Sequence, residues 1–259
     1  MNFVRCGSGA PPLLFAHGFA CSHEDWKLQL EALQGRHEAI ACDLRGHGAT
    51  PGRAHECSIE HCGGDVAALL NNLGLAKTLL VGHSMGSRVV LEAARIDPER
   101  VAGIVLIDGS RQASGDPGAA EAAMRASIGA MGFPAFLDNA FRQMRCSDAI
   151  LERAKRLPAE TGTALWTRMV RWDAAHMEAA LAALRVPLMV IQSTYIDHNR
   201  QRRSLAAGQS TPWLELVRET VPGARIEVIP GVGHFTQLDA ADEVNRLLAD
   251  FLTNTLMKS

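Results

Sequence analysis

The stretch Lys77-Thr-Leu-Leu-Val-Gly-His-Ser-Met-Gly-Ser-Arg-Val-Val-Leu-Glu-Ala-Ala94 decides the fold. Residues 78–81 form an apolar run of strand length, and residues 84–95 follow a helical pattern. The turn Gly82-His-Ser-Met-Gly86 stands between them. This strand–turn–helix context predicts a nucleophile elbow, which exposes Ser84 at the carboxyl edge of a sheet.

A Gly-x-Ser-x-Gly string alone is weak evidence, because a tight turn with a serine N-cap has the same letters. The elbow adds physical requirements. Gly82 and Gly86 are needed where strand and helix crowd together. The N–H of Met85, at the helix N-terminus, is placed to stabilise a developing oxyanion. We expect the second donor at Phe19, where Gly18 lets the backbone approach closely.

Apolar runs alternate with helical patterns along most of the chain. Such continuous runs are typical of a parallel sheet covered on both faces, so we predict a doubly wound, mostly parallel α/β fold. The predicted strands are residues 12–16, 37–43, 78–81, 101–108, 186–192 and 225–229.

This rhythm stops between Arg111 and Leu184, where only helical patterns follow one another. The expected helices are residues 117–130, 134–144, 148–156, 161–171 and 176–184. An insertion after a strand's carboxyl end lies over the place where open α/β sheets bind ligands. We therefore expect a core domain of residues 1–110 and 185–259, with residues 111–184 as a helical lid. Its candidate substrate contacts are Phe133, Phe136, Trp166 and Met169, although a single side chain of this kind more often packs the lid to itself and to the body.

Composition restricts the class of protein. The chain has 259 residues, 47% of them hydrophobic, and a net charge of −2. It has neither a basic patch nor an apolar run of about 18 residues, so we expect no nucleic-acid partner and no membrane span. Six cysteines occur without a CxxC pair, and the N-terminus lacks a leader pattern. We expect reduced thiols, a cytoplasmic protein, and neither metal nor cofactor.

A serine hydroxyl needs a base within reach, and the base needs an orienting carboxylate. His234 follows the last predicted strand in a Gly-rich loop, so we assign it as the general base. Asp197, after the strand that ends at Gln192, gives the order Ser…Asp…His and is the preferred acid. Asp108, at the end of the strand after the elbow, is the alternative.

These motifs span nearly the whole chain in one order, and together they resemble the α/β-hydrolase family in its lid-bearing esterase, lactonase and carbon–carbon hydrolase branch. The residues that carry the resemblance are His17-Gly18-Phe19, Asp43-Leu-Arg-Gly-His-Gly48, Gly82-His-Ser-Met-Gly86, Val186-Pro187, Asp197 and Gly233-His234. The resemblance implies cofactor-free acyl transfer through an acyl-enzyme. The chain departs from the pattern after Gln192, where the family's Gly-x-x-Asp is replaced by Ser193-Thr-Tyr-Ile-Asp197.

We therefore expect a serine hydrolase of a small carboxylic ester or lactone with an apolar portion. One alternative is hydrolysis of a carbon–carbon bond in a vinylogous diketone. There Arg200, Arg202 and Arg203 would hold a substrate carboxylate, although such a run is more often a solvated face. A second alternative is a small-molecule receptor on a hydrolase scaffold. The substrate and the oligomeric state stay open.

Overall fold

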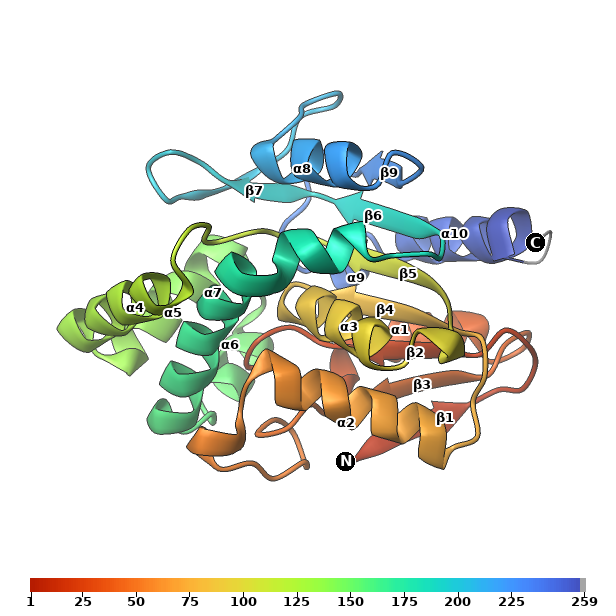
Figure 1. Ribbon diagram of the computed structural model, residues 1–259, viewed down its shortest axis with the longest axis horizontal. Helices are drawn as coiled ribbons and strands as arrows, with labels where there is room; N and C mark the ends of the chain where they lie inside the picture. Colours follow the sequence, from red (N-terminus) through yellow and green to blue (C-terminus); the bar gives the residue numbers. More distant parts are fainter. Residues whose placement is uncertain (257–259) are drawn as a thin grey trace.

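Seven strands form one sheet in the order β1-β3-β2-β4-β5-β6-β9, and all neighbouring pairs are parallel except β1 with β3. The computed structural model describes residues 1–256 (Figure 1). The strands of the sheet are β1 Phe3–Cys6, β2 Leu13–Ala16, β3 Ala39–Cys42, β4 Thr78–His83, β5 Val101–Ile107, β6 Leu188–Gln192 and β9 Arg225–Val228.

The predicted α/β sheet is confirmed, with all six expected strands in place. The sequence missed β1, an antiparallel edge strand. It also missed a short hairpin of β7 (Thr194–Ile196) and β8 (Arg202–Ser204), where we expected only a polar loop. Strands of three residues carry too little alternation to be recognised.

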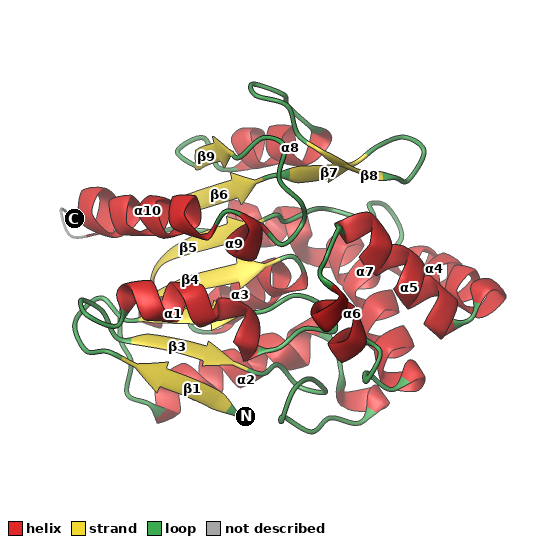
Figure 2. Cartoon of the chain, turned by 180° about the vertical axis from the view of Figure 1, so that it is seen from behind, coloured by secondary structure: helices red, strands yellow, loops and turns green. Residues whose placement is uncertain are grey.

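Helices cover both faces of the sheet (Figures 1 and 2). Along β2, Leu13 and Phe15 pack into the core beneath α1 and α10, whereas Leu14 and Ala16 pack into the core beneath α2, α3 and α8. Successive residues of a strand point to opposite faces, so a strand buried on both sides must be apolar throughout. The covering helices are α1 Lys27–Leu33, α2 Ile59–Asn72, α3 Met85–Ile96, α8 Pro212–Thr220 and α10 Ala241–Phe251, and the short α9 Thr236–Asp239 precedes α10.

Four helices, α4 to α7, stand between β5 and β6 in the chain and lie beyond the arrowheads of the parallel strands (Figure 2). They are α4 Pro117–Met131, α5 Phe133–Met144, α6 Asp148–Ala154 and α7 Ala159–Ala182. The expected break between residues 171 and 176 is wrong, because α7 is one helix of 24 residues. The intervening residues contain no glycine or proline, so nothing in the backbone ends the helix there. Within residues 1–256, no helix is both long enough and apolar enough to cross a membrane.

A buried ion pair joins the helix after the elbow to this group of helices. Arg88 of α3 binds Asp173 of α7 through two hydrogen bonds of 2.7 Å, and both side chains are almost fully buried. The same guanidinium donates to the carbonyl oxygens of Ser84, at 3.2 Å, and Ser110, at 2.7 Å. The contact therefore fixes α7 directly against the backbone of the elbow.

Replacing Arg88 with methionine should lower the free energy of unfolding by about 3–5 kcal/mol, because the Asp173 carboxylate stays buried without its cation. Urea denaturation measures the change. The matched control is Arg246→Met, which breaks exposed pairs with Glu243 and Asp250 and should cost less than about 1 kcal/mol. Equal losses in the two variants would contradict this account.

Candidate active site

Ser84 occupies the sharp turn between β4 and α3, with φ 53° and ψ −112°. A residue with a side chain seldom adopts this strained backbone conformation. The Ser84 N–H donates to the carbonyl of Ile107 in β5 at 2.9 Å. A Cβ on Gly82 would lie 2.3 Å from the carbonyl oxygen of Gly86, and one on Gly86 would lie 2.1 Å from that of Ala16. Both glycines are therefore required for the turn.

His234 brings the loop after β9 back to Ser84. Its Nε2 lies 2.9 Å from Ser84 Oγ, and its Nδ1 lies 2.5 Å from Asp108 Oδ2. The Nδ1–H donates to the carboxylate, so the Nε2 lone pair faces the serine hydroxyl. The arrangement can remove a proton from Ser84 and stabilise the imidazolium that forms.

Asp108 is the carboxylate that the structure brings to His234. It directly follows β5, has φ 44°, and is buried. Its Oδ1 accepts from the backbone N–H groups of Ser193, at 2.9 Å, and Thr194, at 2.7 Å, and the Thr194 hydroxyl donates to Oδ2. The loop after β6 therefore holds the carboxylate by donating to it, although the carboxylate itself comes from β5.

The preference for Asp197 over Asp108 as the partner of His234 is corrected by these contacts. Asp197 lies at the exposed turn between β7 and β8, where its carboxylate accepts from the N–H groups of Asn199 and Gln201, each at 2.9 Å, and pairs with Arg203 at 3.1 Å. Soon after Gln192 the strands β7 and β8 pair as a hairpin. Asp197 therefore lies at the turn of this hairpin and not at the edge of the main sheet.

The three arginines of this segment have different surroundings. Arg200 and Arg203 are exposed, as expected of a solvated face. The side chain of Arg202 is only 9% exposed and lies against Asp108 and His234. The sequence alone does not distinguish Arg202 from Arg200 and Arg203. The β8 strand does, because adjacent residues of a strand point to opposite faces, which separates Arg202 from Arg203.

Burial determines the protonation of this cluster. Desolvation and the charge of Arg202 lower the pKa of His234 to about 4, and the opposing effect of Asp108 is smaller. Burial alone would raise the pKa of Asp108, but the hydrogen bond and charge of His234, together with Arg202, hold it below its ordinary value. His83 donates from Nε2 to the His234 carbonyl at 2.9 Å, and burial lowers its pKa to about 3. At neutral pH, His234 is a neutral base beside an ionised carboxylate.

Of the two predicted oxyanion donors, Met85 lies in the elbow and Phe19 in the loop after β2. Met85 is the first residue of α3, so its N–H has no acceptor within the helix. A Cβ on Gly18 would lie 3.4 Å from Ser84 Cβ, which places the loop bearing Phe19 beside the serine. In the part of the chain that the structure describes, neither N–H donates to another protein group. Among the described residues, both N–H groups are therefore without a protein acceptor, as an oxyanion donor must be.

The predicted substrate contacts gather above this loop. The ring of Phe19 lies 4.7 Å from Trp166 of α7 and 6.5 Å from Phe133 of α5, and Phe136 lies 4.9 Å from Trp166. Met169, one turn beyond Trp166, is buried. The three aromatic rings contact one another in sequence, and two of them contact Phe19, so α5 and α7 give the loop an apolar cover.

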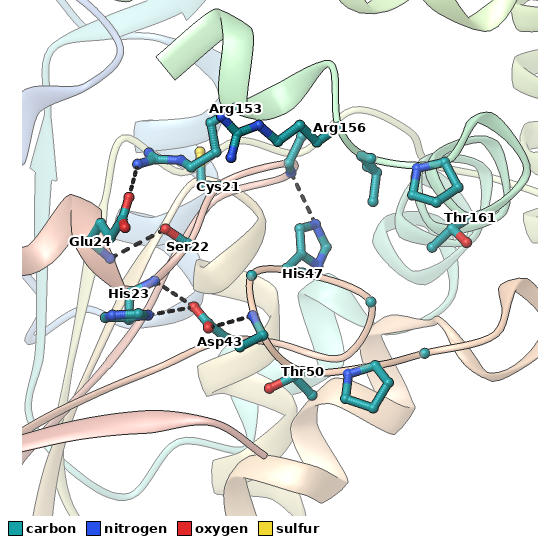
Figure 3. Close-up of a pocket in the computed structure, with 18 residues that line it drawn as sticks. Cys21, Ser22, His23, Glu24, Asp43, His47, Thr50, Arg153, Arg156 and Thr161 are labelled. Atoms are coloured by element: carbon teal, nitrogen blue, oxygen red, sulfur yellow. Dashed lines mark hydrogen bonds and ion pairs between the residues drawn. The ribbon is translucent and has the colours of Figure 1, made fainter. Parts of the chain in front are cut away.

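A cavity of about 750 Å³ adjoins the same loop, which continues from Phe19 into Ala20 (Figure 3). It is bounded by the loops after β2 and β3 and by the connection between α6 and α7. Across it, Arg153 binds Glu24 at 2.8 Å and also Asp25, and His47 accepts from the Ala20 N–H at 3.0 Å. Neither Ser84 nor His234 lines this cavity.

Comparison with known proteins identifies the family that the sequence matches. A family model described as the alpha/beta hydrolase family matches residues 13–247. Among solved structures, the chain is similar to a thermophilic esterase from Thermogutta terrifontis, with TM-score 0.78 and 24% identity over 98% of this chain and 93% of that one. It is also similar to the enol-lactonase from Burkholderia xenovorans LB400, with TM-score 0.76 and 20% identity over 97% and 96% of the two chains.

A curated relative is the dihydrolipoyllysine-residue acetyltransferase component of the acetoin cleaving system from Pseudomonas putida. It is 30% identical over 265 aligned residues, which cover 96% of this chain and 65% of the relative. The chain therefore spans a little under two thirds of the length of this relative.

Exchanging Asp108 for asparagine should slow the labelling of Ser84 by a fluorophosphonate probe by about 10³–10⁴-fold, because His234 loses the group that fixes its tautomer and stabilises its charge. Asp197→Asn is the matched control and should label at the wild-type rate. The site assignment fails if Asp197→Asn is the slower variant.

The labelling rate of the wild-type protein should stay on its plateau well below neutral pH and fall to half near pH 4. Only neutral His234 can accept the serine proton, and its pKa is lowered from 6.5 to about 4. A pH series with circular dichroism as the folding control measures this. A midpoint near the ordinary histidine value of about 6.5 would contradict the lowered pKa.

Proposed function

The chain belongs to the alpha/beta hydrolase family. We propose that it is a serine hydrolase of a small carboxylic ester or lactone with an apolar portion. The observation that carries the proposal is the continuous contact from Ser84 Oγ through the His234 ring to Asp108. A nucleophile, a base and an orienting carboxylate in this order form the constellation used for acyl transfer.

In the proposed reaction, His234 Nε2 takes the proton of Ser84 as Oγ attacks the substrate carbonyl. The N–H groups of Phe19 and Met85 bind the oxyanion. Collapse of the tetrahedral intermediate expels the alcohol, which receives the proton from His234. Water then attacks the acyl-enzyme with His234 again as base, and the acid product leaves Ser84. Asp108 stays ionised throughout and stabilises the imidazolium.

We also propose that residues 111–184 act as a lid on a core of residues 1–110 and 185–259. Helices α5 and α7 place Phe133 and Trp166 against the ring of Phe19, with Phe136 packed on Trp166, next to one proposed oxyanion donor. An apolar cover of this kind suits an apolar acyl or alcohol group. The names of the similar esterase and lactonase are consistent with this substrate class.

Acyl transfer to a thiol is a second candidate, favoured by the Pseudomonas putida relative, whose name describes an acetyltransferase. It needs the same acyl-enzyme and replaces water by a thiol acceptor. For the carbon–carbon alternative, the three arginines expected to hold a substrate carboxylate give little support. Arg202 is bound to Thr194 beside Asp108, Arg203 is paired with Asp197, and Arg200 is exposed between β7 and β8. The receptor alternative requires binding without multiple turnover.

Ser84→Ala should abolish turnover and leave the fold intact, while Ser114→Ala, a change at an exposed serine, should behave as wild type. The panel consists of p-nitrophenyl esters of increasing acyl length, an acyl-homoserine lactone, and acetyl-dihydrolipoamide. Thermal unfolding of each variant controls for folding. Turnover of one class by wild type and Ser114→Ala alone supports the proposal, and the preferred chain length measures the pocket.

Wild-type turnover that survives in a clean Ser84→Ala preparation would refute the serine mechanism. Stoichiometric labelling of Ser84 without multiple turnover of any substrate would instead support the receptor alternative. Acyl transfer is distinguished by adding dihydrolipoamide to an ester reaction and measuring whether thioester forms in place of free acid.

A further inference from the structure

The guanidinium of Arg202, on the β7–β8 hairpin, lies beside the contact between His234 Nδ1 and Asp108. Arg202 Nη1 lies 2.6 Å from the hydroxyl oxygen of Thr194, 3.1 Å from His234 Nδ1 and 3.5 Å from Asp108 Oδ2. The Thr194 hydroxyl in turn donates to Asp108 Oδ2. Arg202, Thr194 and His234 therefore converge on one carboxylate oxygen.

Burying a guanidinium is costly unless it is paired and hydrogen bonded. The neighbouring Arg200 and Arg203 stay exposed, so burial on this hairpin is particular to Arg202. In the described chain, the acceptors of the Arg202 guanidinium are the Thr194 hydroxyl and the Asp108 carboxylate. The charge of Arg202 is thus directed at the pair that activates Ser84.

We propose that Arg202 is a positioning residue, which holds the Thr194 hydroxyl and the Asp108 carboxylate in place beside Nδ1 of His234. The inference rests on the proposed serine-hydrolase function and deepens it. Arg202 donates to Thr194, Thr194 donates to Asp108, and Asp108 accepts from His234 Nδ1. This chain restricts Oδ2 to the direction in which it fixes the imidazole tautomer.

The cation has a second effect, because it opposes protonation of the adjacent ring. Charged and titratable groups face His234 from four elements or loops: His83 from β4, Arg88 from α3, Asp108 from the end of β5, and Arg202 from β8. Asp108 and Arg202 are the two that contact Nδ1. Without the charge of Arg202, the Asp108 carboxylate stabilises the protonated ring more effectively. The pKa of His234 therefore rises.

The test compares Arg202→Met with Arg203→Met, the exposed neighbour on the same strand. Fluorophosphonate labelling of Ser84 is followed from acid to neutral pH. We expect Arg202→Met to raise the acid midpoint by about 1–3 pH units and to lower the plateau rate by about tenfold. Arg203→Met should match wild type in both. A purely structural role would lower the plateau without moving the midpoint.

Two further variants separate charge from hydrogen bonding and remain informative if Arg202→Met does not fold. Arg202→Lys keeps the cation, so its midpoint should stay near that of wild type. Thr194→Val removes the hydroxyl bridge, so its plateau should fall while its midpoint stays. A shifted midpoint in Arg202→Lys with an unchanged plateau in Thr194→Val would overturn the proposal.

An NMR titration of the His234 ring separates this inference from the proposed function, because it needs no reaction. The expected result is the same upward shift in folded Arg202→Met. If that variant titrates and labels as wild type, the role of Arg202 is refuted while the hydrolase stands. If wild type turns over no substrate but the titration shifts, the hydrolase proposal fails and the coupling of Arg202 to His234 is supported.

Discussion

The site depends on one buried charge, the carboxylate of Asp108. An ionised carboxylate can stay buried only if its oxygens are fully hydrogen bonded or paired. Here the donors come from three places: the backbone after β6, the β7–β8 hairpin and the loop after β9. Satisfying this carboxylate therefore assembles segments separated by up to 126 residues. The base, its tautomer and its orientation follow from that assembly.

Asp108 and Asp197 show how the fold can separate two tasks that one loop often combines. The loop after β6 supplies N–H donors and a hydroxyl, and β5 supplies the carboxylate. Adjacent parallel strands end at the same edge of the sheet, so a carboxylate on either strand can approach the same histidine. The carboxylate that contacts His234 follows β5, and the segment after Gln192 forms a hairpin that places Arg202 beside that carboxylate.

The sheet, the elbow, Ser84 and His234 were predictable because each depends on local pattern: apolar runs of strand length, glycines beside a serine, and a histidine after the last strand. The choice of carboxylate was not. Motif order favoured Asp197, but contact with His234 is decided by how residues 193–204 fold, and three-residue strands leave no periodic signal. Arg202 was missed for the same reason. The two helices expected at residues 161–171 and 176–184 form the single α7, because residues 172–175 contain no helix-breaking glycine or proline.

The ion pair between Arg88 and Asp173 has a consequence for local unfolding. The guanidinium that holds α7 also binds the carbonyl of Ser84, so detaching α7 from α3 exposes two buried charges and releases the backbone of the elbow at once. Such a penalty joins both segments into one cooperative unit. The middle of α7 should therefore open together with α3 and the elbow, so the amide hydrogens around Asp173 should exchange with those of that unit.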